Sequence, residues 1–329
     1  MLVITLAGAE IAASAFYFLV VTSKFEAARA EAGHYYRASA DAALAYELAP
    51  GFRLEREGRD LTINSLGLRG SEPAPSKTAM RFAVLGDSVT FGIGQDDART
   101  IPRLMEAKLR RECETSVEVV NLAVPGYGAR ELSELLEVKA PRLMLDGVIY
   151  LMNLNDFARR DSIYEGADAG LYRMYHPPVL KLPYLLRKAV YRWMKGTQMD
   201  NMTPSLDWYR WMMGGTMRET LNDVGAMKLW ANAHDISFAI SILPSGIGLS
   251  GGTNALANEQ RIVAEALRSQ GIAVVDDVRP FLGSTDLFDE TDHLTDRGND
   301  VVSTQLVQTL KSALPEVSAK AGCRSGVMK

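Results

Sequence analysis

The chain has 329 residues, of which 47% are hydrophobic and 23% are charged, and its formal net charge is -4. This composition is typical of a protein that folds mainly in water, and it excludes a largely disordered chain or one with many membrane spans. Acidic and basic residues are interspersed, so the concentrated basic stripe that a nucleic-acid backbone requires is missing, and we expect no nucleic-acid partner. The two cysteines, Cys113 and Cys323, are too few for a disulfide framework or a cysteine-rich metal site, although a single bridge stays open.

The N-terminal segment, residues 2–21, is apolar almost without interruption. About twenty apolar residues are what a helix needs to cross a bilayer. No charged side chain precedes the segment, which disfavours a cleaved secretory signal, so we interpret residues 1–23 as a transmembrane anchor. A buried core helix is the alternative. Glu10 interrupts the segment, and because a carboxylate costs about 3 kcal/mol at mid-membrane, we expect it to lie off-centre, to be protonated or to pair with another helix.

The stretch that follows, residues 24–79, leads from this segment to the main domain. Residues 24–48 are rich in Ala and Glu and predict a helical continuation, whereas residues 49–79 are polar and punctuated by Gly and Pro. Lys24, Arg29 and Arg37 would keep this flank in the cytoplasm under the positive-inside tendency.

The main domain is predicted over residues 80–315, before a polar tail at 316–329. In it, short β-rich apolar runs alternate with helical patterns. The predicted strands are 82–85, 117–122, 147–152, 238–243 and 272–275, and the predicted helices are 99–112, 129–139, 217–234, 256–270 and 297–313. This alternation implies a mostly parallel sheet of about five strands, covered by helices on both faces, with ligands beyond the carboxyl ends of the strands.

An insertion over residues 157–216 breaks the alternation and is rich in aromatic, Met and Arg side chains. Such a segment either caps an active site as a lid or substrate wall, or packs its own aromatic side chains as a helical subdomain. The sequence leaves both interpretations open.

The strongest local motif is Gly86-Asp87-Ser88-Val89, which directly follows the first predicted strand. A serine at the carboxyl end of a strand is well placed for nucleophilic attack, and its backbone N–H is able to stabilise an oxyanion at the same point. The alternative is an ordinary turn, because Gly, Asp and Ser are common turn formers.

A candidate base lies far downstream at His293, just before a helix that Thr295 is able to cap. Acidic residues surround it at Asp289, Glu290 and Asp292. The other histidines, at positions 34, 176 and 234, lie in the juxtamembrane segment, in the insertion and at a helix end. Only His293 follows the last predicted strand, where a sheet of this kind places its site.

Two candidate oxyanion donors follow the strands in between. Gly126 comes after the second strand, where the lack of a Cβ lets its backbone amide approach a ligand. Asn155 comes after the third strand, where its side-chain amide is available to developing negative charge.

Together, the Ser88 motif, Gly126, Asn155-Asp156 and the acid-x-x-His sequence ending at His293 resemble the four blocks of the SGNH (GDSL-like) hydrolase superfamily, in the same order. The lead-in Asn64 to Gly70 looks like that of membrane-anchored bacterial members. The resemblance implies a three-layer α/β/α flavodoxin-like fold, hydrolysis of carboxylic esters and no metal or organic cofactor. It also implies an exported domain, periplasmic or extracellular.

The same resemblance assigns the site residues. Ser88 is the expected nucleophile, and the oxyanion hole is expected to consist of the Ser88 and Gly126 amides and the Asn155 side chain. Two positions depart from the family pattern: Asn153 stands where Gly is usual, and Glu290 stands where Asp is usual three residues before the histidine. We take Glu290 as the residue that orients His293, with Asp289 and Asp292 as alternatives.

Other functions remain in competition. Gly126-x-Gly128 resembles the start of a dinucleotide-binding motif, but Glu131 stands at the position of the third glycine. A nucleophile elbow of the α/β-hydrolase type requires Gly two residues after the serine, where this chain has Thr90. An O-acyltransferase of the same fold acting on cell-surface glycans, or an inactive glycan-binding scaffold, fits the motifs as well. The sequence does not identify the ester, whether a small molecule or a glycan, and it does not give the oligomeric state.

Overall fold

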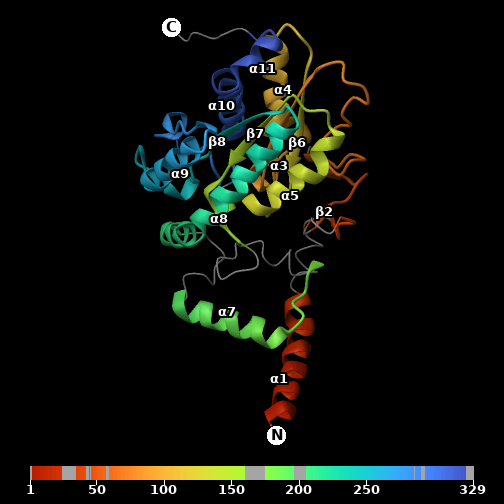
Figure 1. The fold of residues 1–329 in the computed structure, drawn as a ribbon, viewed down its shortest axis with the longest axis vertical. Coiled ribbons are helices and arrows are strands. Elements are labelled where there is room, and N and C mark those ends of the chain that lie inside the picture. Colours follow the sequence, from red (N-terminus) through yellow and green to blue (C-terminus); the bar gives the residue numbers. More distant parts are fainter. Residues whose placement is uncertain are drawn as a thin grey trace.

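The computed structural model describes residues 2–23, 35–41, 44, 46–56, 59–159, 175–195, 205–284, 286–289 and 293–323. At its centre is a five-stranded parallel sheet (Figure 1). The order of its strands is β11-β8-β7-β5-β6. The strands are β5 (Met80–Gly86), β6 (Val117–Ala123), β7 (Gly147–Met152), β8 (Ser237–Ile242) and β11 (Ala273–Val275). All the predicted strands are confirmed, and their spatial order is that of a flavodoxin-like sheet.

Helices cover both faces of the sheet, which confirms the three-layer prediction. Side chains alternate along β5, so that Ala83 and Leu85 enter one core while Phe82 and Val84 enter the other. The first core is closed by α5 (Ala129–Lys139), α8 (Leu206–Ala233) and α9 (Ala257–Ser269), and the second by α4 (Ile101–Glu112) and α10 (Asp296–Ala313). Strands buried on both faces explain the continuous apolar runs in the sequence.

Helix α8 begins at Leu206, eleven residues before the predicted start at 217. Ser205 caps it by accepting a hydrogen bond from the Trp208 backbone N–H at 3.1 Å. Burial of the aromatic and Met side chains of its first turns, among them Tyr209 and Met212, outweighs the low helix propensity of the Gly pair at 214–215. The last part of the predicted insertion therefore belongs to the core, whereas residues 160–174 and 196–204 lie outside the described residues.

The approach to the domain differs from the helical continuation expected over residues 24–48. Residues 24–34 are outside the described part of the chain, and beyond them β1 (Tyr36–Arg37) pairs antiparallel with β2 (Glu47–Leu48). A second ribbon joins β3 (Arg53–Arg56) to β4 (Arg59–Thr62). Aromatic side chains decide the outcome, because Tyr36 and Tyr46 are buried against the domain instead of lying on a solvated helix.

The N-terminal helix α1 (Leu2–Phe16), continued by a π-helical turn over Tyr17–Thr22, projects from the domain (Figure 1). Its segment Val3–Val20 is long and apolar enough to cross a membrane, and only 11% of it is buried, which disfavours the core-helix alternative. A signal sequence would meet the same criteria. Helix α7 (Lys181–Lys195) runs across its axis.

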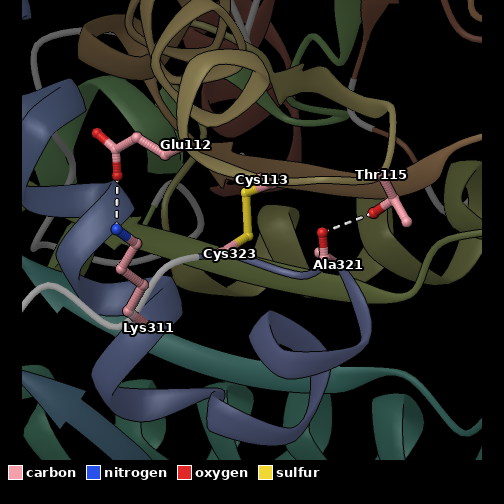
Figure 2. The surroundings of a disulfide bond; sticks show 6 residues. All are labelled: Glu112, Cys113, Thr115, Lys311, Ala321 and Cys323. Carbon is pink, nitrogen blue, oxygen red and sulfur yellow. Dashed lines mark hydrogen bonds and ion pairs between the residues drawn. A yellow bond between two sulfur atoms is a disulfide. The ribbon is translucent and has the colours of Figure 1, made fainter.

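The C-terminal segment packs against the domain through α11 (Pro315–Lys320). Beyond it, Cys323 forms a disulfide with Cys113 at the end of α4 (Figure 2). Thr115 Oγ1 donates to the Ala321 carbonyl at 2.7 Å beside the bridge. The bridge that composition left open is therefore present, and it joins residues 210 positions apart.

The remaining elements are short. They are α3 (Ser88–Phe91), the hairpin of β9 (Leu249–Ser250) and β10 (Thr253–Asn254), and 3-10 turns at Asp97–Arg99, Ala140–Arg142, Leu154–Phe157, Gly246–Gly248 and Arg279–Phe281.

Candidate active site

The strand order reverses at β5. The next strand in the chain, β6, lies on one side of β5, and the later strands, beginning with β7, lie on the other. Ser88 follows β5, Gly126 follows β6 and Asn155 follows β7, so the three predicted residues come from neighbouring strands at one edge. Such a switch point is where open α/β sheets bind their ligands.

Ser88 is the first residue of α3, and Asp87 caps that helix by accepting a hydrogen bond from the Val89 N–H at 3.0 Å. A Cβ on Gly86 would overlap the hydroxyl of Thr90, which explains the glycine before the motif. Ser88 is held at the start of a helix, and the residue is 8% exposed.

The structure brings His293 to Ser88. The distance from His293 Nε2 to Ser88 Oγ is 3.1 Å, across 205 positions of sequence. The backbone next to the histidine is hydrogen-bonded to the loop that follows Ser88 and α3, because Gln95 Nε2 donates to the Leu294 carbonyl at 2.9 Å. Thr295 Oγ1 accepts from the Gly298 N–H at 3.2 Å and caps α10 as expected. His34 lies outside the described residues, and His234 contacts its own helix through Trp230.

Of the three acidic residues that are candidates to orient His293, the structure describes one. Glu290 and Asp292 lie outside the described residues. Asp289 is described, and its Oδ2 lies 4.0 Å from His293 Nδ1, beyond hydrogen-bond distance. Its backbone N–H donates to the His293 carbonyl at 2.9 Å.

Asn155 and Asn153 both contact Asp87. Asn155 Nδ2 donates to Asp87 Oδ2 at 3.1 Å, and Asn153 Nδ2 donates to Asp87 Oδ1 at 2.6 Å. The side chain at the position that departs from the family pattern thus adds a hydrogen bond to the residue before the serine. An amide group carries two N–H bonds, so Asn155 keeps one further donor beside this contact.

A buried pair of carboxyl groups, Asp87 and Asp156, lies beneath the serine. Burial raises the pKa of Asp87, although hydrogen bonds from the Val89 N–H and the Asn155 amide and the charge of His293 oppose the shift. Burial, together with the nearby charge of Asp87, raises the pKa of Asp156 well above its ordinary value. Tyr150 donates its hydroxyl to Asp156 Oδ2 at 2.7 Å. Two carboxyl groups in one buried site disfavour the charged form of each other.

Sequence reasoning gave no role to this network. Asp87 and Asp156 were visible only as members of motifs, because nothing in a sequence says that a carboxyl group is fully buried. Tyr150 carried no signal at all, since it reads as an ordinary strand residue.

Gly126 lies in the loop between β6 and α5 with φ of 79°, a left-handed conformation that favours glycine. The loop is fixed on both sides. Val124 donates its N–H to the Gly86 carbonyl at 3.2 Å, and the Tyr46 hydroxyl donates to the Pro125 carbonyl at 2.7 Å. The segment before the domain therefore supports the Gly126 loop.

Arg69, in the lead-in, supports the end of α3 and the loop that follows it. Its guanidinium is 1% exposed and donates to the carbonyls of Phe91, Gly92 and Gln95 and, at 2.9 Å, to Asp97 Oδ1. The resemblance to the family includes the lead-in Asn64 to Gly70, but it does not indicate a role for Arg69.

Within the described part of the chain, no group of three or more His, Cys, Asp or Glu side chains is arranged to hold a metal ion.

The sequence of the domain matches a family model, "GDSL-like Lipase/Acylhydrolase family", over residues 84–301. The chain belongs to this family. It is therefore an ester-hydrolysing enzyme of the GDSL type, as the motifs implied.

Solved structures also resemble this GDSL enzyme. A lipase/acylhydrolase from Enterococcus faecalis is 13% identical with a TM-score of 0.44, over 70% of this chain and 95% of that one. The esterase EstA from Pseudoalteromonas sp. is 12% identical with a TM-score of 0.43, over 71% and 98%. A catalytic mutant of Axe2, an acetylxylan esterase from Geobacillus stearothermophilus, is 15% identical with a TM-score of 0.41, over 71% and 95%. At these values the likeness does not bear on substrate or mechanism. No curated protein matches the chain.

Proposed function

We propose that this GDSL enzyme hydrolyses carboxylic esters with Ser88 as nucleophile and His293 as base. The observation that carries the proposal is the 3.1 Å distance between Ser88 Oγ and His293 Nε2, which is within reach for proton transfer. His293 takes the hydroxyl proton while Ser88 Oγ attacks the ester carbonyl, and the protonated imidazole then returns the proton to the leaving alcohol. Water, activated by the same imidazole, releases the acid and restores the serine.

The proposed oxyanion hole consists of the Ser88 N–H, the Gly126 N–H and the second N–H of the Asn155 amide. Support comes from the origin of these groups on three neighbouring loops at the carboxyl edge of the sheet. Asp87 supports this arrangement by accepting the first N–H of Asn155, which fixes the plane of the amide.

We propose carbohydrate O-acetyl groups as the candidate esters. They require a nucleophile, a base and an oxyanion hole, and no metal. Turnover of O-acetylated glycans, measured beside acyl esters of increasing chain length, tests this assignment. A marked preference for long acyl chains would contradict it.

We also propose the division of the chain. Residues 1–23 anchor the enzyme in a membrane, residues 24–79 connect the anchor to the domain, and residues 80–315 form the hydrolase domain on the exported side. The disulfide between Cys113 and Cys323 supports export, because disulfides persist in oxidising compartments, and it outweighs the basic residues that follow the anchor.

The decisive test of the mechanism replaces the nucleophile. Ser88→Ala should fold normally and lose p-nitrophenyl acetate turnover by more than about 1000-fold, because no other group takes over the attack. A fluorophosphonate probe should label the wild type at Ser88 and leave the variant unlabelled. Full turnover by Ser88→Ala, or labelling elsewhere, would refute the assignment.

A further inference from the structure

Helix α7 presents an unusual surface. At the positions whose side chains the structure describes, every exposed residue of α7 is apolar. Leu186 and Val190 are 57% and 54% exposed, and Trp193 is 85% exposed. With Pro183, they recur at intervals of three and four residues and therefore form one stripe along the helix, which we call the apolar stripe of α7. Val179 and Leu180 extend it before the helix begins.

The charges of the helix are of one sign. The segment 179–195 contains five Lys or Arg residues and no acidic residue. Arg187 and Lys188 are partly buried and lie over the ring of Tyr184, at 5.9 and 5.8 Å from its centroid. A helix with one apolar stripe, a terminal Trp and only basic charges has the composition of helices that lie in the surface of anionic bilayers.

The helix is attached to the proposed anchor. The Glu10 carboxylate accepts the backbone N–H groups of Lys181 and Leu182 at 2.6 and 2.9 Å, and so caps α7 from the side of α1. Tyr17 and Tyr184 make an edge contact with ring centroids 5.9 Å apart. The carboxylate that interrupts the apolar segment therefore joins the two helices.

The direction of α7 follows from this attachment. It runs across the axis of α1, beside the half of α1 that lies nearer the domain (Figure 1). If α1 enters a bilayer along its axis, a helix running across it lies in the plane of that bilayer. The exposed side chains of α1, such as Ile11 and Leu19, are apolar as well.

We propose that α7 is a second membrane contact, which starts beside Glu10 in the apolar segment of α1 and keeps its apolar stripe among the acyl chains and its basic side chains near anionic headgroups. The proposal rests on the anchor proposed above. The partner is lipid, because α7 is attached to the apolar helix α1 and its charges complement an anionic surface. A second copy of the chain would offer the same positive charge and would be repelled.

Trp193 provides the test. The full-length chain is reconstituted into vesicles of phosphatidylcholine and phosphatidylglycerol, either unmodified or carrying bromine atoms on the acyl chains, which quench tryptophan on contact. The wild type should be quenched by the brominated lipid, and Trp193→Phe should lose at least half of that quenching. Trp230→Phe is the matched control and should keep it, because Trp230 is stacked on His234 at the far end of α8.

The outcomes separate the two proposals. If the chain floats free of the vesicles, the anchor fails and α7 fails with it. If the chain is bound but Trp193→Phe is quenched as strongly as the wild type, the anchor stands and the α7 contact is overturned. Shielding of the stripe by another protein molecule would give this second result. Arg187→Gln with Lys188→Gln should reduce the quenching in the presence of phosphatidylglycerol more than in its absence.

Discussion

At the residue scale, the site depends on a buried carboxylate, Asp87, whose role the Gly86-Asp87-Ser88-Val89 motif does not reveal. Asp87 receives hydrogen bonds from the Val89 backbone and from the side chains of Asn153 and Asn155. It is adjacent to the proposed nucleophile, so it fixes both the start of α3 and the orientation of the amide that we assign to the oxyanion hole.

The two asparagines separate these roles. Asn155→Ala should lower kcat by about 100- to 1000-fold, the effect of removing one oxyanion donor, or about 2.7–4 kcal/mol. Asn153→Ala is the matched control, because it removes a hydrogen bond to the same carboxylate but no oxyanion donor, and it should cost about tenfold or less. Steady-state kinetics on one ester measures both. Equal losses would mean that Asn155 serves only to hold Asp87.

The acid partner of His293 is a second residue-scale prediction. Glu290→Gln should lower kcat by about 1000- to 10,000-fold with little change in KM, because we propose that the Glu290 carboxylate fixes the tautomer of the imidazole. Asp289→Asn should have a smaller effect, since Asp289 Oδ2 lies 4.0 Å from His293 Nδ1. Asp292→Asn completes the series. If Asp289→Asn is the most damaging of the three, the orienting role passes to Asp289.

At the scale of elements, the sheet and its main helices could be predicted from the sequence. Strands that are buried on both faces consist of continuous apolar residues, and such runs are recognisable in a sequence. The sequence did not predict the segment before the domain. This segment is held by long-range contacts of Tyr36, Tyr46 and Arg69. The periodicity of apolar residues in the sequence indicates only local structure and does not reveal such contacts. The start of α8 was missed for a similar reason, since tertiary burial outweighs the local preference of two glycines.

The lead-in should matter to catalysis through the loops that it holds. Arg69→Met keeps much of the side-chain length but removes every hydrogen bond to the loop after α3. We expect a loss of unfolding free energy of about 3 kcal/mol or more, because several buried carbonyls lose their donor, and a fall in kcat at temperatures where the variant is still folded. Thermal unfolding and turnover measured side by side test this. Arg53→Met, in the neighbouring exposed ribbon, is the control and should change neither.

At the scale of the whole molecule, the site and the disulfide lie at opposite ends of the sheet. Ser88 follows the carboxyl end of β5, whereas Cys113 precedes the start of β6. The candidate site was predictable because motifs mark the ends of strands. The pairing of the cysteines was not, because two residues separated by 210 positions show no sign of meeting.

Removal of the bridge should therefore affect stability and spare catalysis. Replacing both Cys113 and Cys323 by Ser should cost about 2–5 kcal/mol of unfolding free energy, since the unfolded chain regains the freedom that the bridge removes. Turnover per folded molecule should stay unchanged. Thermal unfolding of the wild type with and without reductant should show the same shift. No shift on reduction would contradict a bridge in the isolated protein.

The direction of the sheet has one more consequence. Its carboxyl edge, from which the serine and histidine loops extend, faces the end of the molecule where α1 and α7 lie (Figure 1). An enzyme tethered in this way would work within a thin shell of solution above its own membrane. Polymers and lipids tethered nearby would meet it at high local concentration, while dissolved esters would reach it only as fast as they diffuse into that shell.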